Sequence, residues 1–396
     1  MDDQKLNPDL YELSLNGAND TIREIAQQPL CWKQIPALLD KQNPALYRLI
    51  AEQLDHRDAV ITFCGAGTSA YIGQILAATV QRFAKARVRA VATTDIVSRP
   101  DNYFSADSQG IVFAFGRSGN SPESIDTAEK VTQLAPNVEQ INVTCNPNGE
   151  LSQRQDGHVC LMPPPTHDSS FVMTSSFSTM LLFTYRLIAR AAGQPSADLG
   201  PVIDCAERWC RQLLIHPAIA SATGASRLVY LGSNTLYGAA REAALKALEM
   251  TAGQVVTLAE TSLGFRHGPK SIVDNHTTVC LFVSNNAYTQ RFDRDMVIEL
   301  LENHQAKQIV AVANQKVCAE LSAKYPDNEL LHFITLPGNL DNVDDVLLAP
   351  LFVLVSQIIA LSLAIRHDIS PDNPCPTGEV NRVVQGVTLY EFKGAL

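Results

Sequence analysis

Three charged residues and one histidine stand out in this chain because of their spacing. Glu242, Lys246 and Glu249 are four and three residues apart in a segment dominated by Ala and Leu, so they share one face of a predicted helix. His267 follows in the sequence Phe-Arg-His-Gly-Pro. Carboxylates, ammonium groups and imidazoles are the groups that enzymes use to move protons. The pattern indicates an acid–base site, with an ordinary surface ion pair between Glu242 and Lys246 as the alternative.

A short strand and a turn must position this helix. The apolar run Leu228–Leu231 predicts a strand that stops at Gly232, and the next three residues, Ser233-Asn-Thr, include several helix-capping types. The helix from Leu236 to about Met250 has no wide polar face, so we expect it to be covered on most sides. Charges on a covered helix need partners or a cleft.

Two other turns follow predicted strands in the first half of the chain. Ala59–Cys64 leads into Gly65-Ala-Gly-Thr-Ser, and Ile111–Phe115 leads into Gly116-Arg-Ser-Gly-Asn-Ser-Pro. Ligands of open parallel sheets bind beyond the carboxyl ends of the strands, where helix N-termini attract anions. The hydroxyl groups expected to complete an oxyanion cradle belong to Thr68, Ser69, Ser118 and Ser121. Ordinary helix caps are the alternative, and neither turn matches a dinucleotide fingerprint or a P-loop.

Composition limits the classes of function. With 396 residues, 46% hydrophobic and 18% charged, the chain can form two domains or one large duplicated unit with a sizeable core. A net charge of −10 argues against binding to nucleic acid or to an anionic membrane. The nine cysteines lack Cys-x-x-Cys or zinc spacing, and no signal peptide is recognised, so we expect reduced thiols, no metal and a cytoplasmic location. The apolar segment near Val346–Ile365 is interpreted as a core or interface helix.

The predicted elements alternate along the chain and then repeat. Strands are expected at Ala59–Cys64, Val88–Ala92, Ile111–Phe115, Gln140–Thr144, His158–Met162, Leu228–Leu231, Val255–Leu258, Thr278–Val283, Gln308–Val312 and Leu331–Ile334, with helices that include Ser69–Ala84, Pro122–Leu134, Ser169–Ala192 and Val343–Ile365. This alternation is typical of a doubly wound parallel α/β sheet, and its restart near Arg227 indicates duplication. The expected organisation is a peripheral helical segment (1–54), two domains (55–200 and 201–367) and an extended, later β-like tail (368–396).

The motifs, taken in order, resemble the SIS (sugar isomerase) phosphosugar-binding family. The resemblance rests on Gly67-Thr-Ser, Arg117-Ser-Gly-Asn-Ser-Pro-Glu-Ser, Arg266-His-Gly-Pro and the tail Gly378-Glu-Val-Asn-Arg-Val-Val-Gln-Gly-Val. It covers about residues 45–392 and implies two tandem SIS-type units similar to the isomerase half of glucosamine-6-phosphate synthase. The most similar group is that of galactosamine-6-phosphate deaminases, also called tagatose-6-phosphate ketose/aldose isomerases.

The resemblance also implies roles for individual residues. A cradle of Gly67, Thr68, Ser69, Ser118 and Ser121 would hold the 6-phosphate. In the synthase-like helix motif, Lys246 and Glu249 would be catalytic, with Glu249 moving a proton between C2 and C1, and His267 would open the sugar ring. The remaining candidates for substrate contact are Arg117, which replaces a hydroxyl-bearing pair of the synthase, Glu260 in the loop after the strand, and Arg382 in the tail.

The chemistry implied is a deaminating isomerisation of galactosamine 6-phosphate, without a metal or organic cofactor. No glutaminase domain that would supply ammonia is recognised in the sequence, so we expect deamination or isomerisation rather than synthesis. The family resemblance implies a homodimer or higher oligomer. Two alternatives stay open: an isomerase or deglycase of another sugar phosphate, and a phosphosugar sensor without catalysis. Against the sensor, no DNA-binding extension is recognised.

Overall fold

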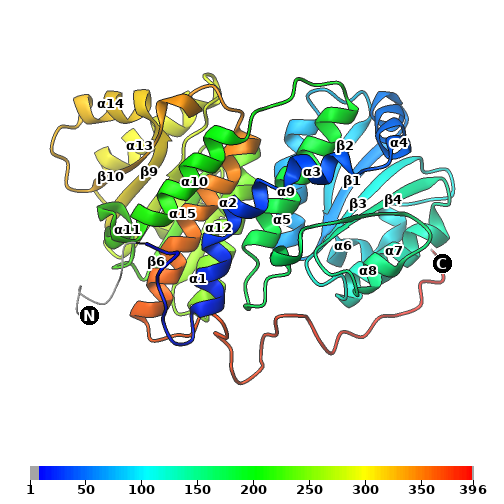
Figure 1. The fold of residues 1–396 in the computed structure, drawn as a ribbon. Coiled ribbons are helices and arrows are strands. Elements are labelled where there is room, and N and C mark those ends of the chain that lie inside the picture. The colour runs from blue at the N-terminus through cyan, green and yellow to red at the C-terminus, as the bar shows by residue number, and fades with distance from the viewer. Residues whose placement is uncertain (1–8, 395–396) are drawn as a thin grey trace. The chain divides into compact units, whose positions relative to one another are not determined.

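The computed structural model describes residues 9–394, and these residues form two compact units that are interleaved along the chain (Figure 1). The first-sheet unit comprises residues 30–168, 173–197 and 377–394. The second-sheet unit comprises residues 9–29, 169–172 and 198–376. The domain boundaries expected from the sequence at residues 54, 200 and 367 stay a prediction.

A five-stranded parallel sheet is the centre of the first-sheet unit. Its strands, in spatial order, are β2 (Arg87–Ala92), β1 (Val60–Gly65), β3 (Gly110–Gly116), β4 (Val138–Thr144) and β5 (His158–Leu161). The central strands β1 and β3 are almost continuous runs of buried residues, most of them apolar, as expected when helices cover both faces of a parallel sheet.

Helices pack in two groups around this sheet. Helices α3 (Ile35–Asp40), α4 (Pro44–Asp55) and α5 (Thr68–Val80) all contact α9 (Ser175–Ala191). Helix α7 (Pro122–Leu134) contacts both α6 (Thr93–Ser98) and α8 (Glu150–Gln153). Helix α2 (Gln28–Trp32) crosses the boundary between the units in sequence. Single turns of 3₁₀ helix are η2 (Pro100–Asn102) and η3 (Pro164–Thr166).

The second-sheet unit repeats this architecture. Its parallel strands lie in the order β10 (Leu331–Leu336), β9 (Gln308–Asn314), β8 (Thr277–Phe282), β6 (Arg227–Gly232) and β7 (Val256–Glu260). Its helices are α1 (Asn19–Ala26), α10 (Gly200–Gln212), α11 (Pro217–Ala222), α12 (Thr235–Met250), α13 (Thr289–Asn303), α14 (Gln315–Lys324) and α15 (Asp345–Arg366). The 3₁₀ turns are η4 (Leu213–Ile215), η5 (Gly264–Arg266), η6 (Pro269–Ile272) and η7 (Gly338–Leu340).

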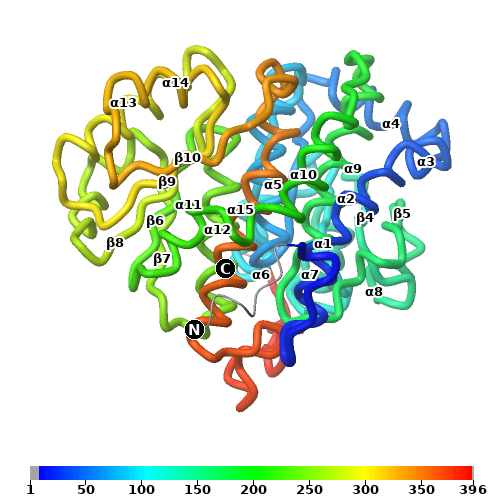
Figure 2. The backbone as a smooth tube through the Cα atoms, turned by 60° about the vertical axis from the view of Figure 1, so that its left-hand side comes forward, coloured from blue at the N-terminus to red at the C-terminus, as the bar shows by residue number. Residues whose placement is uncertain are grey.

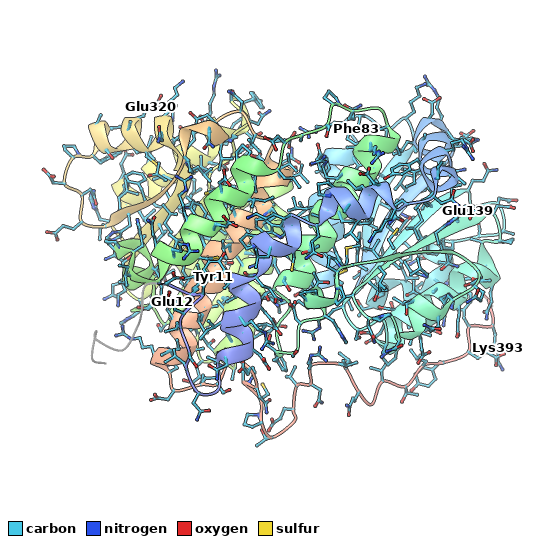
Figure 3. All side chains as sticks on the ribbon, in the orientation of Figure 1. Tyr11, Glu12, Phe83, Glu139, Glu320 and Lys393 are labelled. Carbon is cyan, nitrogen blue, oxygen red and sulfur yellow. The ribbon has the colours of Figure 1, made fainter. Side chains whose placement is uncertain are left out.

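Alternating side chains of β6 and β8 face different layers. Tyr230 and Phe282 form an aromatic stack with Phe352 of α15, with ring centroids 6.0 and 5.1 Å apart. Helix α12 packs against α15, so it belongs to this layer. On the other face, Val229 and Leu231 share a core with Phe265 and with α13. The sheet thus separates α12 and α15 from the segment around Phe265, because successive strand residues point to opposite faces. Figure 2 gives a second view of these layers and Figure 3 shows the side chains that fill the space between them.

The duplication extends to backbone conformation. β1 and β6 end in Gly65 and Gly232, and a Cβ atom at either glycine would clash with the residue four positions later, at 2.6 Å and 2.4 Å respectively. The following helices begin after residues with the same unusual backbone: Gly67 has φ +54° and Asn234 has φ +54°. Both glycines therefore allow a helix to pass directly over the end of its strand.

Most of the predicted architecture is confirmed, including ten strands, two tandem parallel sheets and the order of motifs. Three expectations are wrong. The N-terminal helices are not peripheral: Ile25 of α1 and Trp32 of α2 are fully buried. The helix expected from Ser169 begins at Ser175. The described tail beyond Ile369 contains no strand, although a β-like ending was expected, and Figure 1 shows it as an extended trace.

Candidate active site

Two neighbouring strands bring the residues predicted to form an oxyanion cradle to one edge of the first sheet. β1 and β3 are adjacent and parallel, so their carboxyl ends meet at one edge of the sheet. Thr68 and Ser69 open α5 there, and both are 5% exposed. Ser118 is buried in the turn after β3, and Ser121 is the cap residue before Pro122, the first residue of α7. Helix N-termini at such an edge can bind an anion, and the cradle itself stays a prediction.

A neighbouring loop holds the turn after β3 in place. Asn146 donates from Nδ2 to the Ser118 carbonyl oxygen at 2.9 Å, and the Asn120 side chain accepts from the Glu150 amide at 2.9 Å. Gly119 has φ +66°, and its carbonyl accepts from the Leu151 amide at 3.0 Å. These bonds fix the turn before any ligand arrives, which favours a preorganised anion site.

Two arginines flank the cradle. The Arg117 guanidinium donates to the Arg382 carbonyl oxygen at 3.0 Å, and the Arg382 guanidinium donates to the carbonyl oxygen of Asp168. The tail is therefore hydrogen-bonded through Arg382 to Arg117, which follows Gly116, and to Asp168. His167, which the sequence analysis missed, lies beside both arginines: burial, Arg382 and Arg117 lower its pKa, against the opposing effect of Asp168. An isolated His in a Pro-rich stretch carries no spacing signal that could have identified it.

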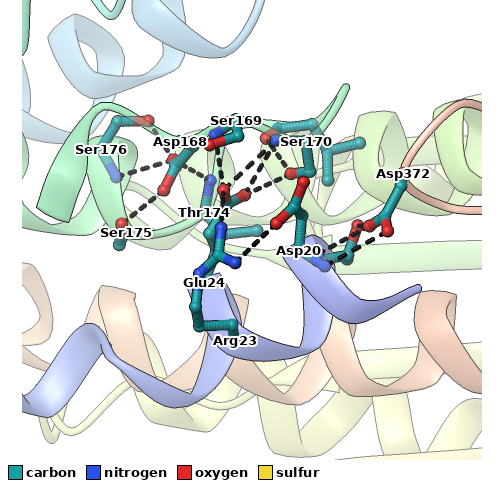
Figure 4. A network of polar contacts seen from close by, with 12 residues as sticks. Asp20, Arg23, Glu24, Asp168, Ser169, Ser170, Thr174, Ser175, Ser176 and Asp372 are labelled. Atoms are coloured by element: carbon teal, nitrogen blue, oxygen red, sulfur yellow. Dashed lines mark hydrogen bonds and ion pairs between the residues drawn. The ribbon is translucent and has the colours of Figure 1, made fainter. Parts of the chain in front are cut away.

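The hydroxyl-rich stretch from Ser169 to Thr179 is used for helix capping and loop bonding (Figure 4). In the first-sheet unit, Asp168 accepts hydrogen bonds from the Ser176 amide at 2.9 Å and from the hydroxyls of Ser175 and Ser176 at the start of α9. In the second-sheet unit, buried Glu24 accepts from the amides of Ser169 and Ser170. These bonds show that the stretch caps α9 and fixes the loop before it, so its hydroxyls at Ser175 and Ser176 are engaged within the protein.

The predicted acid–base cluster lies on α12 in the second-sheet unit. Lys246 is 1% exposed, and its ammonium group lies 2.5 Å from Oε2 of Glu249 and 3.5 Å from Oε1 of Glu242. Glu242 is fully buried, whereas a quarter of the Glu249 side chain is exposed. The alternative of a surface ion pair between Glu242 and Lys246 is therefore wrong. Glu249 is the member of the cluster that solvent or a ligand can reach.

His267 is exposed in the connection between β7 and β8. Its neighbours in sequence, Arg266 and Lys270, both pair with Glu299 of α13, Arg266 at 2.6 Å. Although partial burial opposes the effect, the hydrogen bonds from Lys270 and Arg266 hold the pKa of Glu299 below its ordinary value. Within residues 9–394 the His267 ring has no hydrogen-bond partner, so it is anchored through its neighbours and is free to meet a ligand.

Glu260 ends β7; its expected place in a loop was wrong. Its Oε1 accepts from the Thr261 amide at 2.7 Å, and a Cβ added at Gly264 would lie 2.8 Å from this oxygen. Glu260 therefore supports the start of the turn that leads to His267.

The segments that carry Glu249 and His267 pack on opposite faces of the second sheet. Glu249 is on α12, which packs on the α15 face. His267 follows Phe265, which packs on the α13 face together with Val229 and Leu231. The sequence placed these residues in one structural unit, which is right, but spacing alone could not show that they occupy opposite faces.

The second-sheet unit fills its own version of the cradle with a carboxylate. Asp293 of α13 is fully buried and accepts from the hydroxyls of Ser233 and Ser262, at 2.5 and 2.6 Å, and from the Ser284 amide at 3.0 Å. Burial raises the pKa of Asp293 although these hydrogen bonds oppose it. Ser233 follows β6 and Ser284 follows β8, so the donors that could hold an external anion are already engaged.

Other classes of site find little support in the part of the chain that the structure describes. No group of three or more His, Cys, Asp or Glu side chains within residues 9–394 is arranged to hold a metal ion. The nine cysteines are free thiols, and burial raises the pKa of Cys64, Cys160 and Cys280 to about 12. One described helix, α15, is long and apolar enough to cross a membrane, but 94% of its most apolar window is buried inside the structure.

Comparison with known proteins agrees with this geometry. A family model described as SIS domain matches residues 56–190. A D-galactosamine-6-phosphate deaminase AgaS from Shewanella sp. (strain ANA-3) is 38% identical over 398 residues, covering 99% of this chain and 97% of that protein. The crystal structure of tagatose-6-phosphate ketose/aldose isomerase from Escherichia coli has a TM-score of 0.81 at 32% identity, covering 96% of this chain and 100% of that one.

A more distant structure shares the fold. The C-terminal domain of glucosamine-fructose-6-phosphate aminotransferase from Francisella tularensis has a TM-score of 0.70 at 16% identity, covering 88% of this chain and 96% of that chain. Duplicated parallel sheets with a hydroxyl-lined turn at their carboxyl ends thus define a protein of the SIS type. Because this chain is 38% identical to such a relative over 99% of its own length, it belongs to the family of the AgaS deaminases.

Proposed function

We propose that this protein converts D-galactosamine 6-phosphate and water to D-tagatose 6-phosphate and ammonia. The observation that carries the proposal is the partly exposed Glu249 carboxylate held by the buried Lys246 ammonium group, in a chain that also has the predicted oxyanion cradle. Near-complete alignment with a protein named D-galactosamine-6-phosphate deaminase supports the choice of substrate.

In the proposed mechanism, the cradle of Gly67, Thr68, Ser69, Ser118 and Ser121 binds the 6-phosphate. Backbone amides and hydroxyls at the N-termini of α5 and α7 supply the hydrogen bonds, and helix dipoles favour the negative charge. These groups would bind the end of the substrate that does not react, so they would orient it without taking part in the proton transfer.

Glu249 would act as the base. It takes the proton from C2 and returns it to C1, which converts the amino aldose to a ketimine; water then hydrolyses the ketimine and releases ammonia. Lys246, whose ammonium group lies 2.5 Å from the Glu249 carboxylate, can stabilise the negative charge that develops on the substrate oxygen. Proton transfer by a positioned side chain contributes about 10²- to 10⁴-fold to such reactions.

We further propose that His267 reaches the reacting sugar from a second copy of the chain. An imidazole can exchange protons between the ring oxygen and the 1-hydroxyl. Because the segments that carry His267 and Glu249 pack on opposite faces of the second sheet within one chain, a homodimer or higher oligomer would supply the missing partner. We also propose that three further residues contact the substrate or support the site: Arg117, Glu260 and Arg382. The proposed location of the protein is the cytoplasm.

Mixing inactive variants tests this shared site. Glu249→Gln and His267→Ala should each lose most activity alone. After co-expression, a mixed dimer would contain one site with both native groups, so activity should return to about a quarter of wild type for random assortment of two equally expressed chains. Co-expression without recovery, although mixed oligomers form, would place both groups in one chain's site.

Ammonia release tests the reaction itself. The protein should release ammonia from galactosamine 6-phosphate and much less from glucosamine 6-phosphate, without added metal. Isomerisation of tagatose 6-phosphate without any ammonia release from either amino sugar would favour the second candidate, a plain ketose/aldose isomerase, which the name of the Escherichia coli neighbour suggests.

A further inference from the structure

A pocket whose lining includes two arginines and two aspartates lies at the amino ends of β1 and β2, at the opposite edge of the first sheet from the predicted cradle. It has a volume of about 260 Å³ and is lined by Arg87, Arg89, Tyr103 and Ser108 together with the first residue of β1, Val60. Val60 and Arg87 are paired at the amino ends of β1 and β2. The cradle lies beyond the carboxyl ends, so the length of a six-residue strand, roughly 20 Å, separates the two places.

We call this cavity the basal pocket. Arg89 is the residue on which its proposed chemistry depends. Its Nε donates to Oγ1 of Thr62 at 2.9 Å, and its Nη2 donates to the carbonyl oxygen of Tyr103 at 2.7 Å. The guanidinium carbon lies 5.5 Å from the ring centre of Tyr103 and 5.4 Å from that of Phe104. These contacts hold the half-buried group in one orientation, and cation–π attraction compensates part of its lost hydration.

No carboxylate neutralises Arg89 among the described residues. Neither of the acidic residues of the pocket, Asp58 and Asp107, pairs with it, and both are exposed. Burial and the neighbouring Arg87 lower the pKa of Arg89, which shows that its surroundings disfavour the cation. A partly desolvated cation without a counter-ion is costly, and an arginine retains its charge at any physiological pH.

We infer that the basal pocket is a second anion site, which takes a phosphate group through Arg89 with Arg87 at its rim. The Nη1 of Arg89 can donate to an oxyanion in the cavity, because the hydrogen bonds of the guanidinium to Thr62 and Tyr103 come from Nε and Nη2. The hydroxyl of Ser108, which accepts from the Ser105 amide at 2.9 Å, lines the same cavity and can donate to the ligand. Planar guanidinium groups suit phosphate better than any other side chain.

Calorimetric titration with inorganic phosphate at low ionic strength tests the site. The wild type should bind one phosphate at the basal pocket in addition to any at the cradle. Arg89→Gln should lose one phosphate per chain, whereas the cradle variant Thr68→Val/Ser118→Ala should retain it. Arg99→Gln is the matched control, because Arg99 lies in the following segment, is exposed and pairs with Asp101. It should bind as the wild type does.

A further variant keeps the test decisive if Arg89→Gln does not fold. Arg87 is exposed, so Arg87→Gln should fold and weaken basal binding about fivefold, the effect of one nearby charge in water. Methyl phosphate in place of inorganic phosphate shows whether an ester is also accepted; binding of either supports the site. Loss of all phosphate binding in the cradle variant, or unchanged stoichiometry in Arg89→Gln, would overturn it. These outcomes do not depend on whether the protein deaminates an amino sugar.

Discussion

Lys246 is a buried cation whose position depends on two carboxylates of its own helix. Glu242 is fully buried and Glu249 is partly exposed. Lys246 therefore pairs with one carboxylate in the interior and with the carboxylate that is proposed as the base. Breaking a buried ion pair by removing one partner is much more costly than losing an exposed one, because a charge is left without compensation. The first-sheet unit provides a comparison in Asp126 and Lys130 of α7, which are also buried and four residues apart.

Replacing Lys246 by Met is expected to lower both stability and activity. The free energy of unfolding should fall by about 3–5 kcal/mol, and ammonia release should fall at least about 100-fold. Lys130→Met is the control: it should lose similar stability in urea titrations but keep its activity per folded molecule. Equal loss of activity in both variants would show that Lys246 acts through stability alone. Lys246→Arg, which keeps the charge, should fold if Lys246→Met does not.

At the scale of elements, the N-termini of α5 and α12 have the same backbone with different residues. Gly67 and Asn234 share φ +54°, which only glycine adopts without strain. Asn234→Gly should raise the free energy of unfolding by about 1 kcal/mol, and Gly67→Asn should lower it by about 1–3 kcal/mol. No atom lies within 4 Å of a Cβ built at Gly67, so the cost is one of backbone strain. Denaturant titration would measure both; unchanged stability in the pair would refute the strain.

The start of α15 carries a pH-sensitive carboxylate. Burial raises the pKa of Asp345 to about 6; hydrogen bonds from Ser284 and Asn285 oppose this shift, and the nearby Asp344 and Asp293 add to it. The folded state therefore binds a proton more tightly than the unfolded state, whose Asp pKa is about 3.9. This contribution favours folding below about pH 4 and is lost as pH rises through 6.

Asp345→Asn should remove this pH dependence. Between pH 4 and 7, the difference in unfolding free energy between the variant and the wild type should shift in favour of the variant by roughly 3 kcal/mol. Urea titrations of both proteins at several pH values measure this difference. The contributions of the other carboxylates to the free energy of unfolding cancel in it. Parallel stability curves for the two proteins would contradict the raised pKa.

The sequence predicted where the strands and helices lie better than it predicted which face of a sheet each segment packs against. All ten strands were found because buried parallel strands are apolar runs between turn residues, and Pro122 and Gly65 marked helix starts correctly. The composition of the stretch after Ser169 predicts a helix from Ser169 onward. In the structure the amides of Ser169 and Ser170 bind Glu24, a residue distant in sequence. Such long-range bonds leave no local signal.

At the scale of the whole molecule, duplication produced two similar sheets with different contents. The cradle turns after β1 and β3 present hydroxyls, whereas the equivalent turns after β6 and β8 bond to Asp293. The sequence showed the repeat of Gly65 and Gly232 but not the filled second cradle, because Asp293 lies on a later helix. It also could not show that the segments carrying Glu249 and His267 pack on opposite faces of a sheet. These features support the proposal of one phosphosugar site per chain that is completed by a second copy.

The most direct test of the account is the Glu249→Gln variant with galactosamine 6-phosphate. Its side chain keeps the size of the native one but cannot accept the C2 proton, so ammonia release should fall at least about 100-fold. Binding of the sugar phosphate, measured by calorimetry, should be nearly unchanged because the cradle is intact. Wild-type ammonia release from a correctly folded Glu249→Gln protein would contradict the assignment of Glu249 as the base and, with it, the proposed mechanism.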